Sequence, residues 1–152
     1  MVTYRQILNE NEPATYQVEG IVAVFRSARH GRLQFSLDLH TADEDREFLV
    51  NVVIPANRVW VAEEKKTIVG FIAFDADWIN HLYIAPSFQG QGIGKQLLSI
   101  PKMTASGLRL WVFESNEPAI EFYQKQGFVI AERTDGSTNE AKKPDLLMKW
   151  NR

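Results

Sequence analysis

Apolar residues in the first part of the chain recur with a helical spacing, after one short stretch of alternation. Residues 3–7 alternate between polar and apolar side chains, which predicts a short strand. Pro13 suits the first turn of a helix, and Gly31 suits its end. The pattern therefore predicts a helix between them. The positions that recur at i, i+3, i+4 and i+7 are Val18, Ile21, Val22 and Phe25.

A second helix is predicted to begin at Thr41. Thr41 and Glu44 form the sequence Thr-x-x-Glu, a capping box in which each side chain binds the backbone N–H of the other residue. Pro55 lacks the N–H that a helix interior needs, so we expect the helix to stop there. The stripe expected to be buried consists of Phe48, Leu49, Val52 and Val53.

The period of the apolar positions changes to two after this helix. Residues 58–62, 67–75 and 79–85 are predicted to be strands, separated by polar turns at 63–66 and 75–77. Links this short join antiparallel neighbours, so we expect two hairpins.

The second half of the chain returns to a mixture of helices and strands. A glycine-rich turn precedes a helix that carries Ile93, Leu97 and Leu98, and an apolar strand follows at 108–113. Strand, helix and strand within about 30 residues is the length that a parallel crossover requires.

The chain is predicted to end with one more helix and a pair of strands. The helix begins near Pro118, stops at Gly127 and buries Ile120, Phe122 and Tyr123. The strands follow at 128–132 and 146–149. A mixed sheet flanked by helices is an α+β fold.

Composition restricts the classes of protein that fit. The 152 residues, 45% of them hydrophobic, match one domain, so we expect residues 1–152 to form a single domain. The formal charge of −2 argues against a nucleic-acid binder, and the absence of cysteine excludes disulfides, thiolate metal sites and cysteine nucleophiles. No apolar run approaches the roughly 20 residues of a membrane span, and the first residues lack a signal-peptide pattern. We therefore expect a cytoplasmic protein.

The segment with the most chemical content is Gln89-Gly90-Gln91-Gly92-Ile93-Gly94-Lys95. It joins a predicted strand to a helix, so backbone N–H groups and the positive helix end converge there, as in phosphate sites. A Walker A loop would need glycine at Gln89, and a dinucleotide fingerprint would need it at Lys95 or Leu97. The pattern that fits is Gln-x-x-Gly-x-Gly. A plain strand–helix turn with three glycines also fits this segment taken alone.

The residues on both sides of this turn resemble the GNAT N-acetyltransferase superfamily. His81-Leu82-Tyr83-Ile84-Ala85-Pro86 is similar to the family's fourth strand. Asn116, Ala119, Phe122-Tyr123 and Gly127-Phe128 resemble its second signature, and the polar segment 134–145 resembles a bacterial branch. The resemblance covers most of the chain and is specific from about residue 79 to 128. It implies a central mixed, mostly antiparallel sheet with one splayed parallel strand pair, flanked by about four helices.

This resemblance implies that acetyl-coenzyme A is the cosubstrate and that no metal takes part. The pyrophosphate would lie on backbone amides of the glycine turn, and the pantetheine arm would enter between the splayed strands. The residues that the resemblance assigns to the cofactor are Leu82, Tyr83, Ile84, Gln89, Gly90, Gln91, Gly92, Ile93, Gly94, Lys95, Asn116, Ala119, Phe122 and Tyr123.

The family's reaction, direct attack of a neutral amine on a thioester, requires two proton transfers. Tyr123 occupies the position of the family's general acid, which protonates the leaving thiolate, although beside Phe122 it also suits a core aromatic. A backbone N–H near residues 82–84 would stabilise the oxyanion. Asn116 is expected to cap the last helix, to bind the pantetheine arm, or both. The general base is open among His81, Glu114, Asp77 and an ordered water.

The resemblance places the acceptor amine, a small molecule or a peptide, between segments 29–41 and 134–144. The carboxylates there that would attract a cationic amine are Asp38, Asp135, Glu140 and Asp145, and the cations that oppose this reading are Arg29, Arg32, Lys142 and Lys143. We expect no nucleic-acid or membrane partner. A homodimer stays open because exposed sheet edges often pair.

One residue departs from the family's pattern, and two other functions compete with acetyl transfer. Pro101 lies about two turns into the helix that follows the glycine turn, so we expect that helix to stop or bend near Ile100. The alternatives are a non-catalytic acyl-CoA-binding sensor or interaction module, and a protein that binds ATP or NAD at the glycine turn. Tyr123 argues against the sensor, and the failed phosphate motifs argue against the nucleotide binder.

Overall fold

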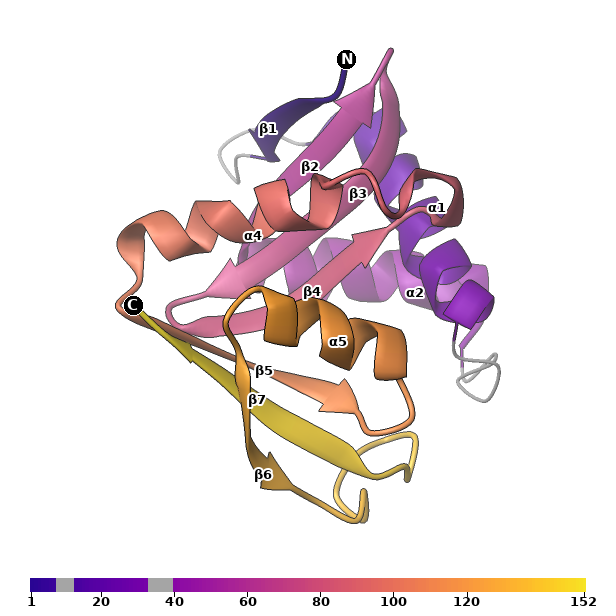
Figure 1. The fold of residues 1–152 in the computed structure, drawn as a ribbon. Coiled ribbons are helices and arrows are strands. Elements are labelled where there is room, and N and C mark those ends of the chain that lie inside the picture. The colour runs from indigo at the N-terminus through magenta and orange to yellow at the C-terminus, as the bar shows by residue number, and fades with distance from the viewer. Residues whose placement is uncertain (8–12, 33–39) are drawn as a thin grey trace.

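The computed structural model describes residues 1–7, 13–32 and 40–152, which form one mixed sheet with helices on both faces (Figure 1). The strand order is β1-β2-β3-β4-β5-β7-β6. The strands are β1 (Thr3–Ile7), β2 (Arg58–Glu64), β3 (Thr67–Asp75), β4 (Trp78–Ile84), β5 (Gly107–Phe113), β6 (Val129–Arg133) and β7 (Asp145–Asn151). The helical elements are α1 (Thr15–Arg32), α2 (Ala42–Phe48), the π turn η1 (Leu49–Val53), α3 (Ile54–Ala56), the 3-10 turn η2 (Pro86–Phe88), α4 (Ile93–Thr104) and α5 (Glu117–Lys125). Within these ranges, no helix combines the length and the apolar character that a bilayer span requires.

β2, β3 and β4 form the two antiparallel hairpins that the alternation predicted. Each hairpin is closed by two residues, so the turns are shorter than predicted, and β2 includes Glu63 and Glu64. Lys65, Lys66 and Ala76 in these turns have positive φ angles of 51°, 63° and 51°. Hairpins this tight favour a left-handed backbone because its twist matches that of the strands.

β4 and β5 run parallel, as the crossover length predicted, but they pair only where they begin. Within these two strands, the pair in register is Trp78 opposite Arg109, and the Arg109 N–H donates to the Asp77 carbonyl at 2.8 Å. Beyond that point the strands diverge (Figure 1). The sheet therefore has two halves, β1 to β4 and β5-β7-β6, that are joined at one end and separated at the other.

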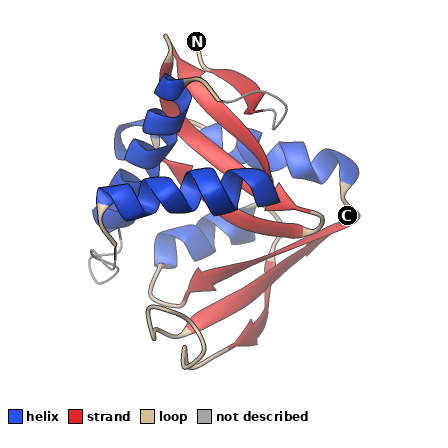
Figure 2. Ribbon diagram, turned by 180° about the vertical axis from the view of Figure 1, so that it is seen from behind, coloured by secondary structure: helices blue, strands red, loops and turns tan. Residues whose placement is uncertain are grey.

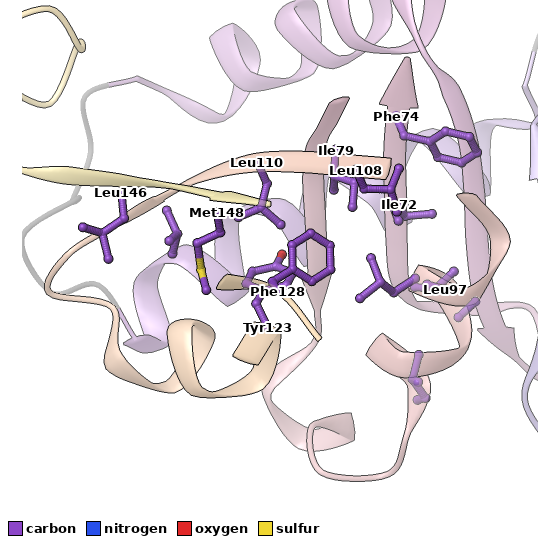
Figure 3. Packing of buried hydrophobic residues seen from close by; sticks show 14 of the residues in the cluster. Ile72, Phe74, Ile79, Leu97, Leu108, Leu110, Tyr123, Phe128, Leu146 and Met148 are labelled. Atoms are coloured by element: carbon purple, nitrogen blue, oxygen red, sulfur yellow. The ribbon is translucent and has the colours of Figure 1, made fainter. Parts of the chain in front are cut away.

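Both faces of the sheet are covered by helices, so the strands contribute to two cores (Figures 1 and 2). On one face, Phe25 of α1 and Leu49 of η1 pack with Phe71 of β3. On the other face, Leu97 of α4 and Tyr123 of α5 pack around strand residues and Phe128, as Figure 3 shows. Burial on both faces fits the long apolar run of β3, where every residue from 68 to 74 is buried.

The second helix differs from the prediction after its first turns. The capping box forms: the Thr41 hydroxyl accepts from the Glu44 N–H at 3.2 Å, and the Glu44 carboxylate accepts from the Thr41 N–H at 3.0 Å. Pro55 does not stop the helix. A π turn, in which the Ile54 N–H donates to the Leu49 carbonyl, inserts one residue, and helical backbone continues to Ala56.

The predicted buried stripe on this helix is half wrong for the same reason. Leu49 and Val53 are buried, whereas Phe48 is 39% exposed and Val52 is 52% exposed. The extra residue in the π turn lets Leu49, Val53 and Ile54 all reach the sheet side. Phe48 and Val52 lie one turn apart on the neighbouring face, which the core does not cover.

The predictions for Pro101 and for the ends of α1 also need correction. α4 does not stop near Ile100 but continues past Pro101 to Thr104, and the Ala105 N–H donates to the Pro101 carbonyl at 3.1 Å. α1 begins at Thr15, two residues after Pro13, and runs through Gly31 to Arg32.

Candidate active site

The glycine turn between β4 and α4 has the backbone that an anion site needs. Gly90 and Gly92 have φ angles of 80° and 81°, and a Cβ at either position would meet nothing within 4 Å. Glycine is therefore favoured there by backbone conformation and not by lack of space. Gly92 is the N-cap of α4, so the first N–H groups of that helix have no carbonyl of their own helix to bind. The Gln89 side chain donates to the Ile84 carbonyl at 3.0 Å and holds the turn against the end of β4.

A cleft of about 420 Å³ runs from this turn along β4 to α5, and we call it the cofactor cleft after the residues predicted to bind the cofactor there. It brings together every residue that the resemblance assigned to the cofactor except Gln91. Helices α4 and α5 approach each other closely at this cleft. A Cβ added to Gly94 would lie only 3.2 Å from the Phe122 ring. The residues of its lining that the sequence did not indicate are Ala28, Phe88, Pro118 and Gln126.

Asn116 begins α5 at the edge of the same cleft. Its side-chain oxygen accepts from the Ala119 N–H at 3.3 Å, so the predicted N-cap is confirmed. Pro118 occupies the first turn of the helix, where its missing N–H costs nothing. The cap fixes the start of the helix that carries Tyr123.

The separation of β4 from β5 opens a second cavity, of about 210 Å³, which we call the strand gap. It lies between residues 79–83 of β4 and residues 110–113 of β5. The strand gap and the cofactor cleft adjoin each other, because five residues line both: Leu82, Tyr83, Asn116, Ala119 and Tyr123.

Tyr123 borders the strand gap from α5, within the core shown in Figure 3. Its ring packs edge-on against Phe122 and Phe128, with centroids 5.2 and 5.4 Å away. Burial, with a smaller contribution from Tyr83, raises the pKa of the Tyr123 phenol well above its usual value. The phenol is therefore uncharged at neutral pH and holds its proton more tightly than an exposed tyrosine does.

The three residues considered for the general base lie in different surroundings. His81 of β4 lines the strand gap. Glu114 follows β5 and forms an ion pair with Arg133 at 2.8 Å. Asp77 precedes β4, at the end where the two strands are joined, and forms an ion pair with Arg109 at 2.9 Å. Among the described residues, His81 is thus the one of the three that borders the gap.

A third cleft, of about 600 Å³, opens on the α1 and α2 face of the sheet, and we call it the acceptor cleft. His81 and Tyr83 line both this cleft and the strand gap. In β4 these two residues alternate with Leu82 and Ile84, which pack on the other face. The strand gap therefore lies next to a cleft on each face of the sheet, with Tyr123 packed on one face and His81 lining the cleft on the other.

The rim of the acceptor cleft joins two segments that are distant in sequence. His40 Nε2 lies 2.7 Å from a carboxylate oxygen of Glu140, and His40 Nδ1 lies 3.4 Å from one of Glu44. Both hydrogen bonds raise the pKa of His40, and the bond to Glu140 has the larger effect. The segment before α2 and the β6–β7 loop therefore meet at the mouth of this cleft.

The structure distributes the predicted acceptor carboxylates differently. Glu140 lines the acceptor cleft. Asp135 caps its own turn, accepting from the Ser137 N–H at 2.9 Å, and Asp145 lines the strand gap, where it accepts from the Thr134 hydroxyl. Asp38 lies outside the described residues.

Sequence reasoning missed the carboxylates that α2 contributes to the acceptor cleft. These are Glu44, Asp45 and Glu47, and Asp45 is held by Arg26 at 2.6 Å. The available signal was the acidic start of the helix, next to Phe48.

Comparison with known proteins agrees with this geometry. A model of the GNAT acetyltransferase domain matches residues 55–130, which hold β2 to β5, the glycine turn and α5. The peptidyl-lysine N-acetyltransferase YjaB of Salmonella typhimurium is 32% identical over 118 residues, 77% of this chain and 80% of that protein. The peptidyl-lysine N-acetyltransferase YiaC of Escherichia coli is 34% identical over 92 residues, 60% of this chain and 62% of that protein.

Solved structures share the fold over the full length of the chain. The solution structure of apo YjaB from Escherichia coli matches with a TM-score of 0.76 and 26% identity, covering 99% of this chain and 97% of that one. The PaiA N-acetyltransferase of Thermoplasma acidophilum, solved in complex with coenzyme A, matches with a TM-score of 0.72 and 23% identity, covering 100% and 99%. The resemblance inferred from residues 79–128 is confirmed, and the chain belongs to the GNAT family of N-acetyltransferases.

Proposed function

We propose that this enzyme transfers the acetyl group of acetyl-coenzyme A to the ε-amino group of lysine side chains in peptides or proteins, by direct attack. The observation that carries the proposal is the strand gap, which adjoins both the cofactor cleft on one face of the sheet and the acceptor cleft on the other. Donor and acceptor can then enter from opposite faces and meet between β4 and β5. The relatives that are named peptidyl-lysine N-acetyltransferases, YjaB and YiaC, support lysine as the acceptor.

The donor would lie along the cofactor cleft. Its diphosphate would accept from the free N–H groups at the start of α4, where the helix dipole also favours negative charge. The pantetheine arm would follow β4, whose backbone beyond Trp78 is not paired with β5. The thioester would then lie in the strand gap, which Tyr123 lines.

Acetyl transfer needs an uncharged amine, and a lysine ammonium must first lose a proton. With a pKa of about 10.4, its neutral form costs about 4 kcal/mol near pH 7.4. His81 borders the gap on the acceptor side and is the group we assign to accept this proton, directly or through water. The amine nitrogen then attacks the thioester carbon, and a backbone N–H of residues 82–84 would stabilise the oxyanion.

Collapse of the tetrahedral intermediate forms the amide and breaks the C–S bond. Tyr123 donates its proton to the departing thiolate, and the proton that remains on the former amine nitrogen restores the phenol. The products are the acetylated lysine, coenzyme A as a thiol, and one proton released from the original ammonium. The raised pKa of Tyr123 keeps the phenol protonated before the C–S bond breaks.

The test measures release of coenzyme A from acetyl-coenzyme A in the presence of a lysine peptide. The chain has no cysteine, so a thiol reagent reports the product without background from the enzyme. We expect amine-dependent release, and Tyr123→Phe should lower kcat by about 100-fold or more while the Kd for coenzyme A stays within about twofold. Binding of acetyl-coenzyme A without release for any amine would instead identify the protein as an acyl-CoA sensor.

A further inference from the structure

Two large apolar side chains on α2 and η1 are exposed where a core stripe was expected. Phe48 and Val52 lie at i and i+4, on the face next to the buried pair Leu49 and Val53. The π turn at 49–53 produces this arrangement, because it directs the buried residues toward the sheet and leaves the other two outside the core. Single π turns of this kind occur frequently at functional sites.

Phe48 and Val52 form one wall of the acceptor cleft. The Phe48 ring lies 5.9 Å from the His81 ring in an edge-on arrangement and 6.4 Å from the ring of Phe25. Tyr83 continues this apolar surface to the entrance of the strand gap. The exposed wall therefore leads directly to the histidine that we assign to proton transfer.

Carboxylates surround this apolar wall. Among the described residues that line the cleft, the acidic ones are Glu44, Asp45, Glu47 and Glu140, and the basic ones are His40 and His81. A side chain that complements such a surface has an apolar stem and a cationic end. Lysine buries its methylenes against apolar surface while its ammonium stays among polar groups.

We propose that Phe48, with Val52, packs along the methylene stem of the acceptor lysine and makes the enzyme selective for primary amines on long stems. This inference rests on the proposed function and assigns a specificity-determining residue to its acceptor side. Asp45 is already paired with Arg26, so the carboxylates that attract the ammonium are Glu44, Glu47 and Glu140. The wall directs the stem toward the strand gap. Each methylene that loses its apolar contact should lower kcat/KM by about fourfold.

A series of peptides that differ only in the length of the amine stem tests this proposal. The acceptors carry lysine, ornithine or 2,4-diaminobutyrate at one position, so that each is one methylene shorter than the one before. The variants are Phe48→Ala and Val52→Ala, with Val50→Ala as the matched control. Val50 belongs to the same π turn and is 39% exposed, but it does not line the acceptor cleft.

We expect Phe48→Ala to lower kcat/KM for the lysine peptide by about tenfold or more, mainly through KM, and to reduce the discrimination between long and short stems. Phe48→Leu should restore part of that discrimination, and Val50→Ala should behave as the unmodified enzyme. A loss by the same factor for every stem length, or an equal loss in Val50→Ala, would overturn the role of Phe48 and leave the proposed function standing. Absence of amine-dependent release in the unmodified enzyme would overturn the proposed function and this inference together.

Discussion

Substitution of Gly92 by alanine isolates the contribution of backbone conformation to the glycine turn. Gly92 has a φ of 81°, and an added Cβ would contact nothing within 4 Å, so the substitution adds strain without a clash. A left-handed backbone costs a residue with a Cβ about 1–2 kcal/mol. For a domain of this size we expect Gly92→Ala to lower the melting temperature by about 2–8 °C.

Asparagine at the same position separates strain from steric hindrance. Asn is larger than Ala but tolerates the left-handed region better, so we expect Gly92→Asn to be the more stable of the two variants. The Kd for coenzyme A should follow the same order, because the turn presents its N–H groups only in this conformation. The strain limits the loss of affinity to about 5- to 30-fold for Gly92→Ala.

The assay combines thermal unfolding by circular dichroism with calorimetric titration of coenzyme A. Two results would contradict the claim that backbone conformation, and not space, requires glycine at position 92. If Gly92→Ala were as stable as the unmodified protein, the turn would not require a left-handed residue. If Gly92→Asn were less stable than Gly92→Ala, the limit at this position would be space and not φ.

Two further predictions follow from the contacts of single side chains. Asn116→Ala removes the N-cap of α5 and should lower the free energy of unfolding by about 0.5–2 kcal/mol in denaturant titration, whereas Asn116→Asp should keep most of it; equal stabilities of the two variants would contradict the capping role. Glu140 and Glu44 raise the pKa of His40, so the contribution of this bridge is fully present below the unfolded pKa of about 6.5 and is lost as pH rises through the higher folded pKa. Glu140→Gln should therefore move the His40 titration, followed by NMR, to lower pH, and an unchanged titration would show that the bridge does not form in solution.

Features that depend only on neighbouring residues, such as helix caps, hairpins and the glycine turn, could be predicted from the amino-acid sequence. The Thr41–Glu44 box, the Asn116 cap, the two hairpins and the glycine turn at 89–95 all form where the pattern indicated. Each follows from local rules: which side chain can satisfy a free N–H, which residue tolerates positive φ, and which periodicity a half-buried strand shows. The resemblance to the GNAT family added an expected chemistry to the glycine turn, because the family's motif lies within that local segment.

The general base and the exposed wall of the acceptor cleft depend on contacts between residues far apart in the chain, so they became visible only in the folded structure. The sequence left the general base open, with His81 as one candidate and Glu114 and Asp77 as alternatives. The divergence of β4 from β5 brings His81 to the gap, while Arg133 and Arg109 form ion pairs with the other two. The exposure of Phe48 could not be predicted from the sequence either, because the π turn that produces it leaves the spacing of apolar residues unchanged. The spacing of apolar residues predicts which side chains share a face of a helix. Which face is buried depends on how the helix packs against the sheet.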